Sequence, residues 1–198
     1  SQPPEYRRQG ALSEDVRRLR EIDLEALPDL QPEEAGEVLL QMLRRPNLVS
    51  KRFVFRRYDH QVLNSTVIPP GGDASLIRVP GTRRGLALTT DCNGRICYLD
   101  PYVGAAAAVA EAVRNIVCVG AEPIGVTDCL NFGNPERPEV YYQLEEAVRG
   151  LGDACRAFGL PVVSGNVSLY NETEGRSVYP TPVVGMVGLI DDVARHTK

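Results

Sequence analysis

The spacing of apolar residues divides the chain into a helical beginning and a part, from residue 53 onward, in which strands and helices mix. Two long stretches, residues 100–123 and 134–159, place apolar residues at helical spacing and end in Gly or Pro, which predicts two helices. Shorter apolar runs bounded by turn residues predict strands. These strands are residues 60–68, 74–79, 85–90, 124–132, 160–170 and 180–190.

The order of these elements predicts the fold class. A turn with the sequence PGTRRG joins the second and third strands and indicates a β-hairpin. A helix, a strand, a second helix and two further strands follow the hairpin. We therefore expect an α/β (α+β) fold, a mixed β-sheet with its helices on one face.

The first of the two long helices is predicted to have two different sides. Glu111 and Asn115 lie one helical turn apart, on the side opposite an apolar stripe. The stripe consists of Ala106, Val109, Ala110, Val113, Ile116 and Val117.

The beginning of the chain is rich in charge and poor in bulky apolar residues. Residues 12–27 can form a short helix, with Ser13 as its cap and Val16 in its apolar stripe. Residues 29–47 form a better helix, with Pro32 near the first turn and Pro46 at the end. We expect residues 1–38 to be a linker or helical lead-in and residues 39–198 to be the domain proper.

Composition and charge exclude several classes of function. The net charge of −4 argues against electrostatic binding of nucleic acid, which requires a basic face. No apolar run approaches the roughly 18 residues of a membrane span, and the polar start predicts no signal peptide. The five cysteines form no CxxC pair, which favours reduced thiols and a cytoplasmic protein.

Polar residues interrupt otherwise apolar elements at four places. In the strand at residues 160–170, an apolar beginning typical of a buried strand passes into small polar residues. Acids and amides without His or Cys nearby are hard oxygen ligands, suited to Mg²⁺ and, through it, to phosphate oxygens. The four groups are Asp73; Asp91 with Asn93; Glu111 with Asn115; and Asp128 with Gly165, Asn166 and Ser168.

Each group also has a purely structural interpretation. Asp73 follows two glycines and can stabilise a turn, while Glu111 and Asn115 can belong to a solvated helix face. The polar residues from 164 to 168 can bond to the backbone at the end of a strand. The familiar phosphate loops GxxxxGK[ST] and GxGxxG are both absent. From the residues alone, the sequence predicts a cytosolic α/β domain suited to Mg²⁺ and phosphate, and nothing finer.

Three long segments resemble the synthetase subunit of phosphoribosylformylglycinamidine synthase, of the small bacterial type. They read YDHQVLNSTVIPPGGDASLIRVPGTRRGLALTTDCN, YLDPYVGAAAAVAEAVRNIVCVGAEPIGVTDCLNFGNPE and GLPVVSGNVSLYNETEG. That subunit has two homologous halves, each with an N-type and a C-type domain like those of aminoimidazole ribonucleotide synthetase. The resemblance implies that this chain is the N-type domain of the second half, a fragment that we expect to be inactive alone.

The resemblance also implies roles for individual residues. Asp128 and Gly165 would contact ATP, Asn166 would bind Mg²⁺, and Ser168 would touch the ribonucleotide. By analogy with the large-type enzymes, Asp73, Glu111 and Asn115 would hold Mg²⁺ at an auxiliary nucleotide site. Asp91 occupies the place of a metal-binding glutamate of the first half. We expect His60, at the place of a proposed catalytic histidine, to be structural.

The implied reaction is the ATP-dependent conversion of formylglycinamide ribonucleotide to formylglycinamidine ribonucleotide, with ammonia derived from glutamine. The substrate amide oxygen is activated by phosphoryl transfer, and ammonia then attacks. The implied partners are a glutaminase subunit and a small accessory subunit, and we expect the isolated chain to form a homodimer through its sheet. One alternative is a non-catalytic module that holds a structural nucleotide. A remoter one is a relative such as selenophosphate synthetase or thiamine-monophosphate kinase.

Overall fold

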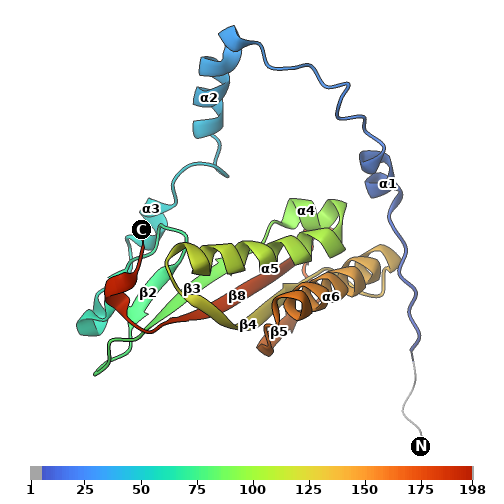
Figure 1. The fold of residues 1–198 in the computed structure, drawn as a ribbon. Coiled ribbons are helices and arrows are strands. Elements are labelled where there is room, and N and C mark those ends of the chain that lie inside the picture. The colour runs from blue at the N-terminus through green and yellow to red at the C-terminus, as the bar shows by residue number, and fades with distance from the viewer. Residues whose placement is uncertain (1–5, 198) are drawn as a thin grey trace, which may run out of the picture.

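The computed structural model describes residues 6–197, and its centre is a six-stranded mixed sheet in the order β1-β2-β3-β8-β4-β5. All neighbouring strands are antiparallel except β4 and β5, which are parallel. The helices α5 and α6 lie side by side across one face (Figure 1). This arrangement confirms the predicted fold class and the hairpin. The strands are β1 Thr66–Ile68, β2 Ser75–Arg78, β3 Gly85–Asp91, β4 Glu122–Asn131, β5 Val162–Ser168 and β8 Thr181–Ile190.

Both predicted long helices form, with ends set by their sequence. Helix α5 spans Pro101–Cys118, and the Asp100 carboxylate caps it by accepting a hydrogen bond of 3.0 Å from the Val103 N–H. Helix α6 spans Pro138–Phe158 and ends at Gly159, whose φ of 68° is the left-handed conformation that favours glycine. A short helix that was not predicted, α4 Gly94–Leu99, is capped by Asn93 and precedes α5.

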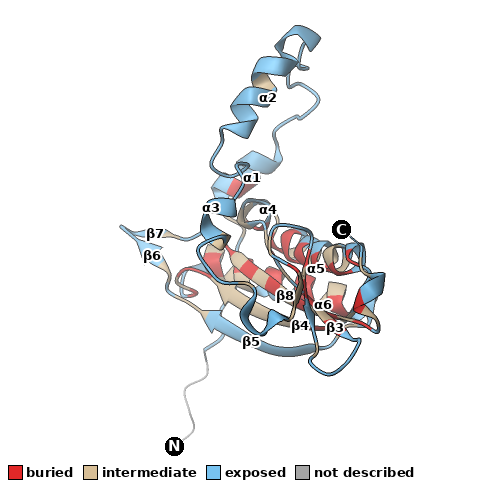
Figure 2. Cartoon of the chain, turned by 90° about the vertical axis from the view of Figure 1, so that its left-hand side faces the viewer, coloured by how far each residue is buried: buried red, intermediate tan, exposed pale blue. Residues whose placement is uncertain are grey.

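The core lies between the sheet and the two helices. Along β8 every second residue is buried, which places Val184 and Met186 against the helices and leaves Gly185 and Val187 on the other side, the open face of the sheet. Figure 2 shows the buried positions concentrated on the inner sides of α5 and α6. The predicted stripe of α5 is rotated from the observed one, because Val117 is exposed and small residues fill the contact. The buried residues of α5 are Pro101, Gly104, Ala105, Ala108, Val109, Ala112 and Ile116.

Two strand predictions need correction. Only the end of the first predicted strand pairs, since residues Val62–Asn64 form a 3-10 turn (η2) in which Leu63 and Asn64 have positive φ. The strand at residues 160–170 was expected to be buried at its start, yet Val162 and Val163 in β5 are 45% and 71% exposed. Strand β5 is the last strand of the sheet, with no neighbour on its outer side, and its residues from Val162 to Val167 are all exposed.

Part of the predicted lead-in packs against the domain. Helix α1, Glu14–Arg20, is capped by Ser13 as predicted, and its Val16 is only 2% exposed. Arg20 donates a hydrogen bond of 2.7 Å to the Leu99 carbonyl of α4, and the Ala11 N–H bonds to the Pro138 carbonyl at 3.0 Å. Residues 11–20 therefore belong to the folded body.

The following segment stands away from the sheet. Helix α2, Ala35–Leu43, follows the 3-10 turn η1 at Pro32–Glu34, contains no buried residue and crosses the expected boundary at residues 38 and 39. Figure 1 shows α2 separated from the sheet and helices. The remaining short elements are α3 Arg52–Phe55, the hairpin of β6 Glu172–Thr173 with β7 Arg176–Ser177, and η3 Val193–Arg195. Among residues 6–197, no helix is both long and apolar enough to cross a membrane.

Candidate functional site

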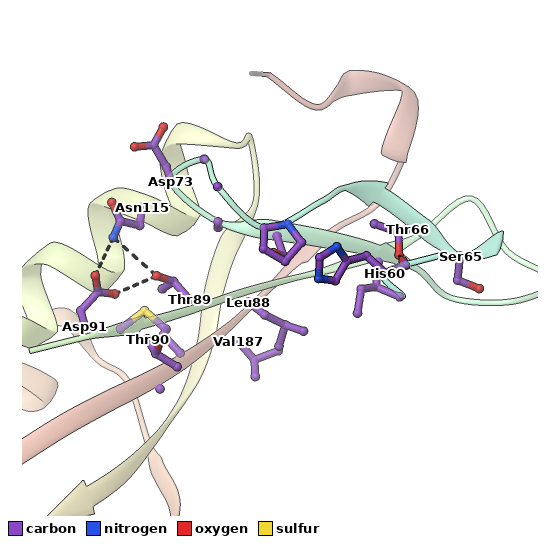
Figure 3. A pocket seen from close by; sticks show the side chains of 18 of the residues that line it. His60, Ser65, Thr66, Asp73, Leu88, Thr89, Thr90, Asp91, Asn115 and Val187 are labelled. Atoms are coloured by element: carbon purple, nitrogen blue, oxygen red, sulfur yellow. Dashed lines mark hydrogen bonds between the residues drawn. The ribbon is translucent and has the colours of Figure 1, made fainter. Parts of the chain in front are cut away.

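A cavity of about 980 Å³ lies beside the loop that joins β1 and β2, and its lining includes Leu88 and Val187 of the open face as well as Asp91 and Asn115 of the helix-covered side. It brings together four residues singled out in the sequence: Asp73 from the loop, Asp91 from the end of β3, Asn115 from α5, and His60. Figure 3 shows Asp73 and Asn115 at the same end of the cavity, with His60 toward the other. Residues from the loop before β2, from the end of β3 and from a helix thus share one pocket.

A hydrogen-bonded cluster holds Asp91 at the cavity wall. The Thr89 hydroxyl donates to one carboxylate oxygen of Asp91 at 2.8 Å, and the Asn115 amide nitrogen donates to the other at 2.8 Å. Burial raises the pKa of Asp91 above its ordinary value, as does the Glu111 carboxylate, whereas the two hydrogen bonds act in the opposite direction. Because the Asn115 nitrogen faces Asp91, its amide oxygen is the atom left for another ligand.

The proposed auxiliary metal ligands are only partly assembled. Asp73 and Asn115 share the cavity, while Glu111 is exposed one turn earlier on α5 and is not among the residues that line it. In the part of the chain that the structure describes, no three His, Cys, Asp or Glu side chains are arranged to hold a metal ion. The donor chemistry, two carboxylates and an amide oxygen, fits Mg²⁺, but the side chains must move together to bind it.

The second candidate group divides between the two faces of the sheet at β4 and β5. Asp128 is opposite buried Val184 of β8 and pairs with Gly165 of β5, so both lie on the helix-covered face. A Cβ added to Gly165 would lie 2.5 Å and 2.6 Å from the two carboxylate oxygens of Asp128. The absence of a side chain at Gly165 therefore makes room for the Asp128 carboxylate, and burial raises the pKa of Asp128.

Asn166 and Ser168 point to the open face, since successive residues of a strand alternate. The Asn166 amide nitrogen donates to the Ser168 hydroxyl at 3.4 Å and approaches the Cys129 sulfur at 3.9 Å. The structure thus joins Asp128 to Gly165 and Asn166 to Ser168, but it does not bring the two pairs to one face.

Sequence reasoning missed three hydroxyls that contribute to the open face or its cavity. Thr89 supports Asp91, and the Thr127 hydroxyl, which lines the cavity, lies 2.8 Å from the Ser164 hydroxyl on β5. Each of these residues precedes or follows a candidate residue by one or two positions. The signal available was the strand alternation itself, which places Ser164 on the same face as Asn166.

The fold and the site together define a class of protein: an α/β domain with helices over one face of a mixed sheet, and with carboxylates, amides and a large cavity at the sheet. The chain belongs to the family described as AIR synthase related protein, N-terminal domain, which matches residues 71–190. This match agrees with the fold expected from the resemblance.

Close relatives extend the similarity over nearly the whole chain. The phosphoribosylformylglycinamidine synthase subunit PurL of Thermomicrobium roseum is 58% identical over 193 residues, covering 97% of this chain and 26% of the relative. The subunit of the same name from Deinococcus radiodurans is 56% identical over 198 residues, covering 98% of this chain and 26% of the relative. The chain therefore spans about a quarter of the length of these relatives.

Solved structures give the same result. The structure of PurLQS from Thermotoga maritima is 40% identical, with a TM-score of 0.71, over 76% of this chain and 25% of that one. The structure of T. maritima PurL complexed with ATP is 39% identical, with a TM-score of 0.67 and the same coverage. A further T. maritima PurL structure is complexed with FGAR.

Proposed function

We propose that this chain is part of an ATP-dependent ligase that converts formylglycinamide ribonucleotide to formylglycinamidine ribonucleotide in cytoplasmic purine biosynthesis. The observation that carries the proposal is the 58% identity, over 193 residues, to a phosphoribosylformylglycinamidine synthase subunit. Residues 39–198 would form the second N-type domain, and the chain alone would be inactive.

The proposed roles follow from the chemistry of each side chain. The Asp128 carboxylate would accept hydrogen bonds from ATP, and Gly165, which has no side chain, would leave room for that carboxylate. The Ser168 hydroxyl can both donate to and accept from a ribonucleotide. Bound Mg²⁺, with Asn166 as a ligand, would offset the negative charge of the phosphates during phosphoryl transfer. Asn166 and Ser168, which contact each other, would position metal and substrate on the same face.

The complete protein would assemble with a glutaminase subunit, which supplies ammonia, and with a small accessory subunit. The solved PurLQS assembly of T. maritima, similar to this chain over a quarter of its matched subunit, supports this proposal.

The second candidate function is a non-catalytic module that holds a structural nucleotide. The cavity of about 980 Å³ beside Asp73 and Asn115 favours it, because a nucleotide with Mg²⁺ requires a large pocket with oxygen ligands. The two functions can coexist, since the cavity and the β4–β5 edge use different residues.

The test compares variants in the full-length enzyme. We expect Asn166→Ala to lower turnover by about tenfold or more with little change in melting temperature, because a strand-edge amide that serves a metal contributes little to folding. Asp73→Asn should instead reduce the stabilisation that added nucleotide gives. Asn47→Ala, an exposed amide outside both groups, is the matched control. Early melting with full specific activity in Asn166→Ala would show a structural role and contradict the proposal.

A further inference from the structure

A second cavity, of about 590 Å³, lies on the other side of the loop formed by Pro70–Asp73. Its walls come from α3 and the residues around it, from this loop, and from Val119 and Thr197. His60 and the loop residues border both cavities, so the two are neighbours separated by the loop. Neither candidate site described above includes the residues of α3.

The walls of this second cavity carry two guanidinium groups. Arg52 and Arg56 both line it, one helical turn apart, and the Arg56 N–H bonds to the Arg52 carbonyl at 3.0 Å. Residues one turn apart share a helix face, so both side chains are directed to the same side. Within residues 6–197 neither guanidinium forms an ion pair, and Asp73 is the one carboxylate among the lining residues.

The sequence around α3 is basic in a chain that is acidic overall. Between residues 44 and 58 there is no Asp or Glu, whereas the chain as a whole has a net charge of −4. The basic side chains of this segment are Arg44, Arg45, Lys51, Arg52, Arg56 and Arg57. Arg52 and Arg56 are the two of these that line the cavity, and because clustered cations repel one another, a binding site for an anion gives their placement there a physical reason.

The facing wall leaves space for a ligand. Gly71 has a φ of +117°, a conformation that residues with side chains rarely adopt, and it brings the loop against the Phe55 ring of α3. A Cβ added to Gly72 would meet nothing within 4 Å. The loop thus contacts α3 at one glycine and stays open at the next.

We propose that this cavity is an anion site that binds a phosphoryl group between Arg52 and Arg56. The planar guanidinium presents paired N–H donors that match two phosphate oxygens, and two such groups suit a doubly charged anion. A carboxylate has one charge and fewer acceptor atoms, so it matches two arginines less well. The inference is independent of the ligase reaction, since neither Arg52 nor Arg56 is assigned to ATP, Mg²⁺ or substrate, although Asp73, a proposed Mg²⁺ ligand, also lines this cavity.

The test measures binding of inorganic phosphate, ADP and adenosine to the 198-residue chain by calorimetry, at constant low ionic strength. We expect phosphate and ADP to bind and adenosine not to bind. The variant with both Arg52→Gln and Arg56→Gln should lose about tenfold or more of the phosphate affinity, because it removes two charge-assisted contacts. Arg57→Gln is the matched control: it removes an exposed, unpaired cation that lines neither cavity, and it should change affinity by less than about twofold. Circular dichroism melts verify that all variants fold.

The outcomes separate the sources of the phosphoryl group and the competing explanations. ADP binding much tighter than inorganic phosphate, with that affinity lost in the double variant, identifies the phosphate end of a nucleotide as the ligand, and equal affinities lost in the double variant identify free phosphate; both support the site. Tight ADP binding that the double variant keeps belongs to another site and overturns the proposal. An equal loss in Arg57→Gln and in the double variant would show general charge attraction and overturn the proposal. Unchanged phosphate binding in a folded double variant, or no phosphate binding by the unaltered chain, would also overturn it.

Discussion

Two glycines in α6, only two residues apart, should respond to alanine with opposite signs. Gly150 faces the start of α5, where an added Cβ would lie 2.8 Å from the carbonyl carbon and 2.9 Å from the Cα of Tyr102, and nearer still to its oxygen. Gly152 faces the Arg156 side chain, whose nearest atom would lie 3.4 Å from an added Cβ. The first neighbour is helix backbone, whereas the second is the end of a flexible side chain.

The size of the effect follows from these distances. Ordinary contact begins at 3.4 Å, so in Gly150→Ala the two helices must separate by at least 0.6 Å, the difference from 2.8 Å. Separation also weakens the hydrogen bond of 3.0 Å from the Tyr102 hydroxyl to Asp153 and the contact of Arg149, 4.5 Å above the Tyr102 ring. Overpacking costs roughly 1–3 kcal/mol and a lost hydrogen bond about 1 kcal/mol, against a gain of about 1 kcal/mol in helix propensity.

We therefore expect Gly150→Ala to lower the free energy of unfolding by about 2 kcal/mol, which is a fall of roughly 4–8 °C in melting temperature for a chain of this size. Gly152→Ala should raise the melting temperature by roughly 2–4 °C, because only the propensity gain remains. Differential scanning calorimetry on the two variants and the unaltered chain gives both shifts. If the two variants melt together, or if Gly150→Ala stabilises, the close packing of α6 on Tyr102 is not what holds these helices.

Three further predictions concern the sheet. Gly165→Ala must displace the Asp128 carboxylate, so ATP binding should weaken. Stability should change by less than about 1 kcal/mol, because the cost of rotating one side chain is offset by the lower entropy of the unfolded chain. Equal losses of ATP binding and of stability would contradict this prediction. Burial raises the pKa of Asp128 above 3.8, so the free energy of unfolding falls as pH rises from about that value through the folded-state pKa. Asp128→Asn should flatten this part of the pH profile in calorimetry and stabilise the fold at neutral pH. An unchanged pH profile in this variant would refute the prediction. The open face of the sheet is apolar, with Ile77 38% and Leu88 37% exposed, and should pair with a second copy of the chain. Light scattering at micromolar concentration should therefore show a dimer, and Leu88→Glu should separate it into monomers. A monomer for the unaltered chain would refute this pairing.

Local patterns predicted the elements of the fold because the forces that form them are local. The hairpin of β2 and β3, the two long helices and the cap at Ser13 all depend on residues close together in sequence. The short helix α4 was missed although Asn93 caps it, because six residues are too few to show a helical period. The packing of α1 could not be predicted, since the burial of Val16 depends on contacts with distant residues.

The cavity that joins Asp73, Asp91 and Asn115 shows the same limit at the site. Each was identified separately as a polar residue in an apolar setting, but their meeting depends on the position of α5 over the sheet. The hydrogen bond from Asn115 to Asp91 links residues 24 positions apart, and no sequence spacing indicates it. Residue types were therefore predictable, whereas their partners were not.

The division of the second group between two faces has a different origin. Strand alternation alone predicts that Gly165 faces away from Asn166 and Ser168, but which face the helices cover depends on the whole sheet. Asp128 and Gly165 lie on the covered face, and Asn166 and Ser168 on the open one, at a strand with a free outer edge. A single ligand could contact both pairs only by passing around that edge. The proposed phosphoryl transfer needs the reacting atoms within about 3.5 Å of each other, so a nucleotide at Asp128 and a substrate at Ser168 would have to meet around that edge.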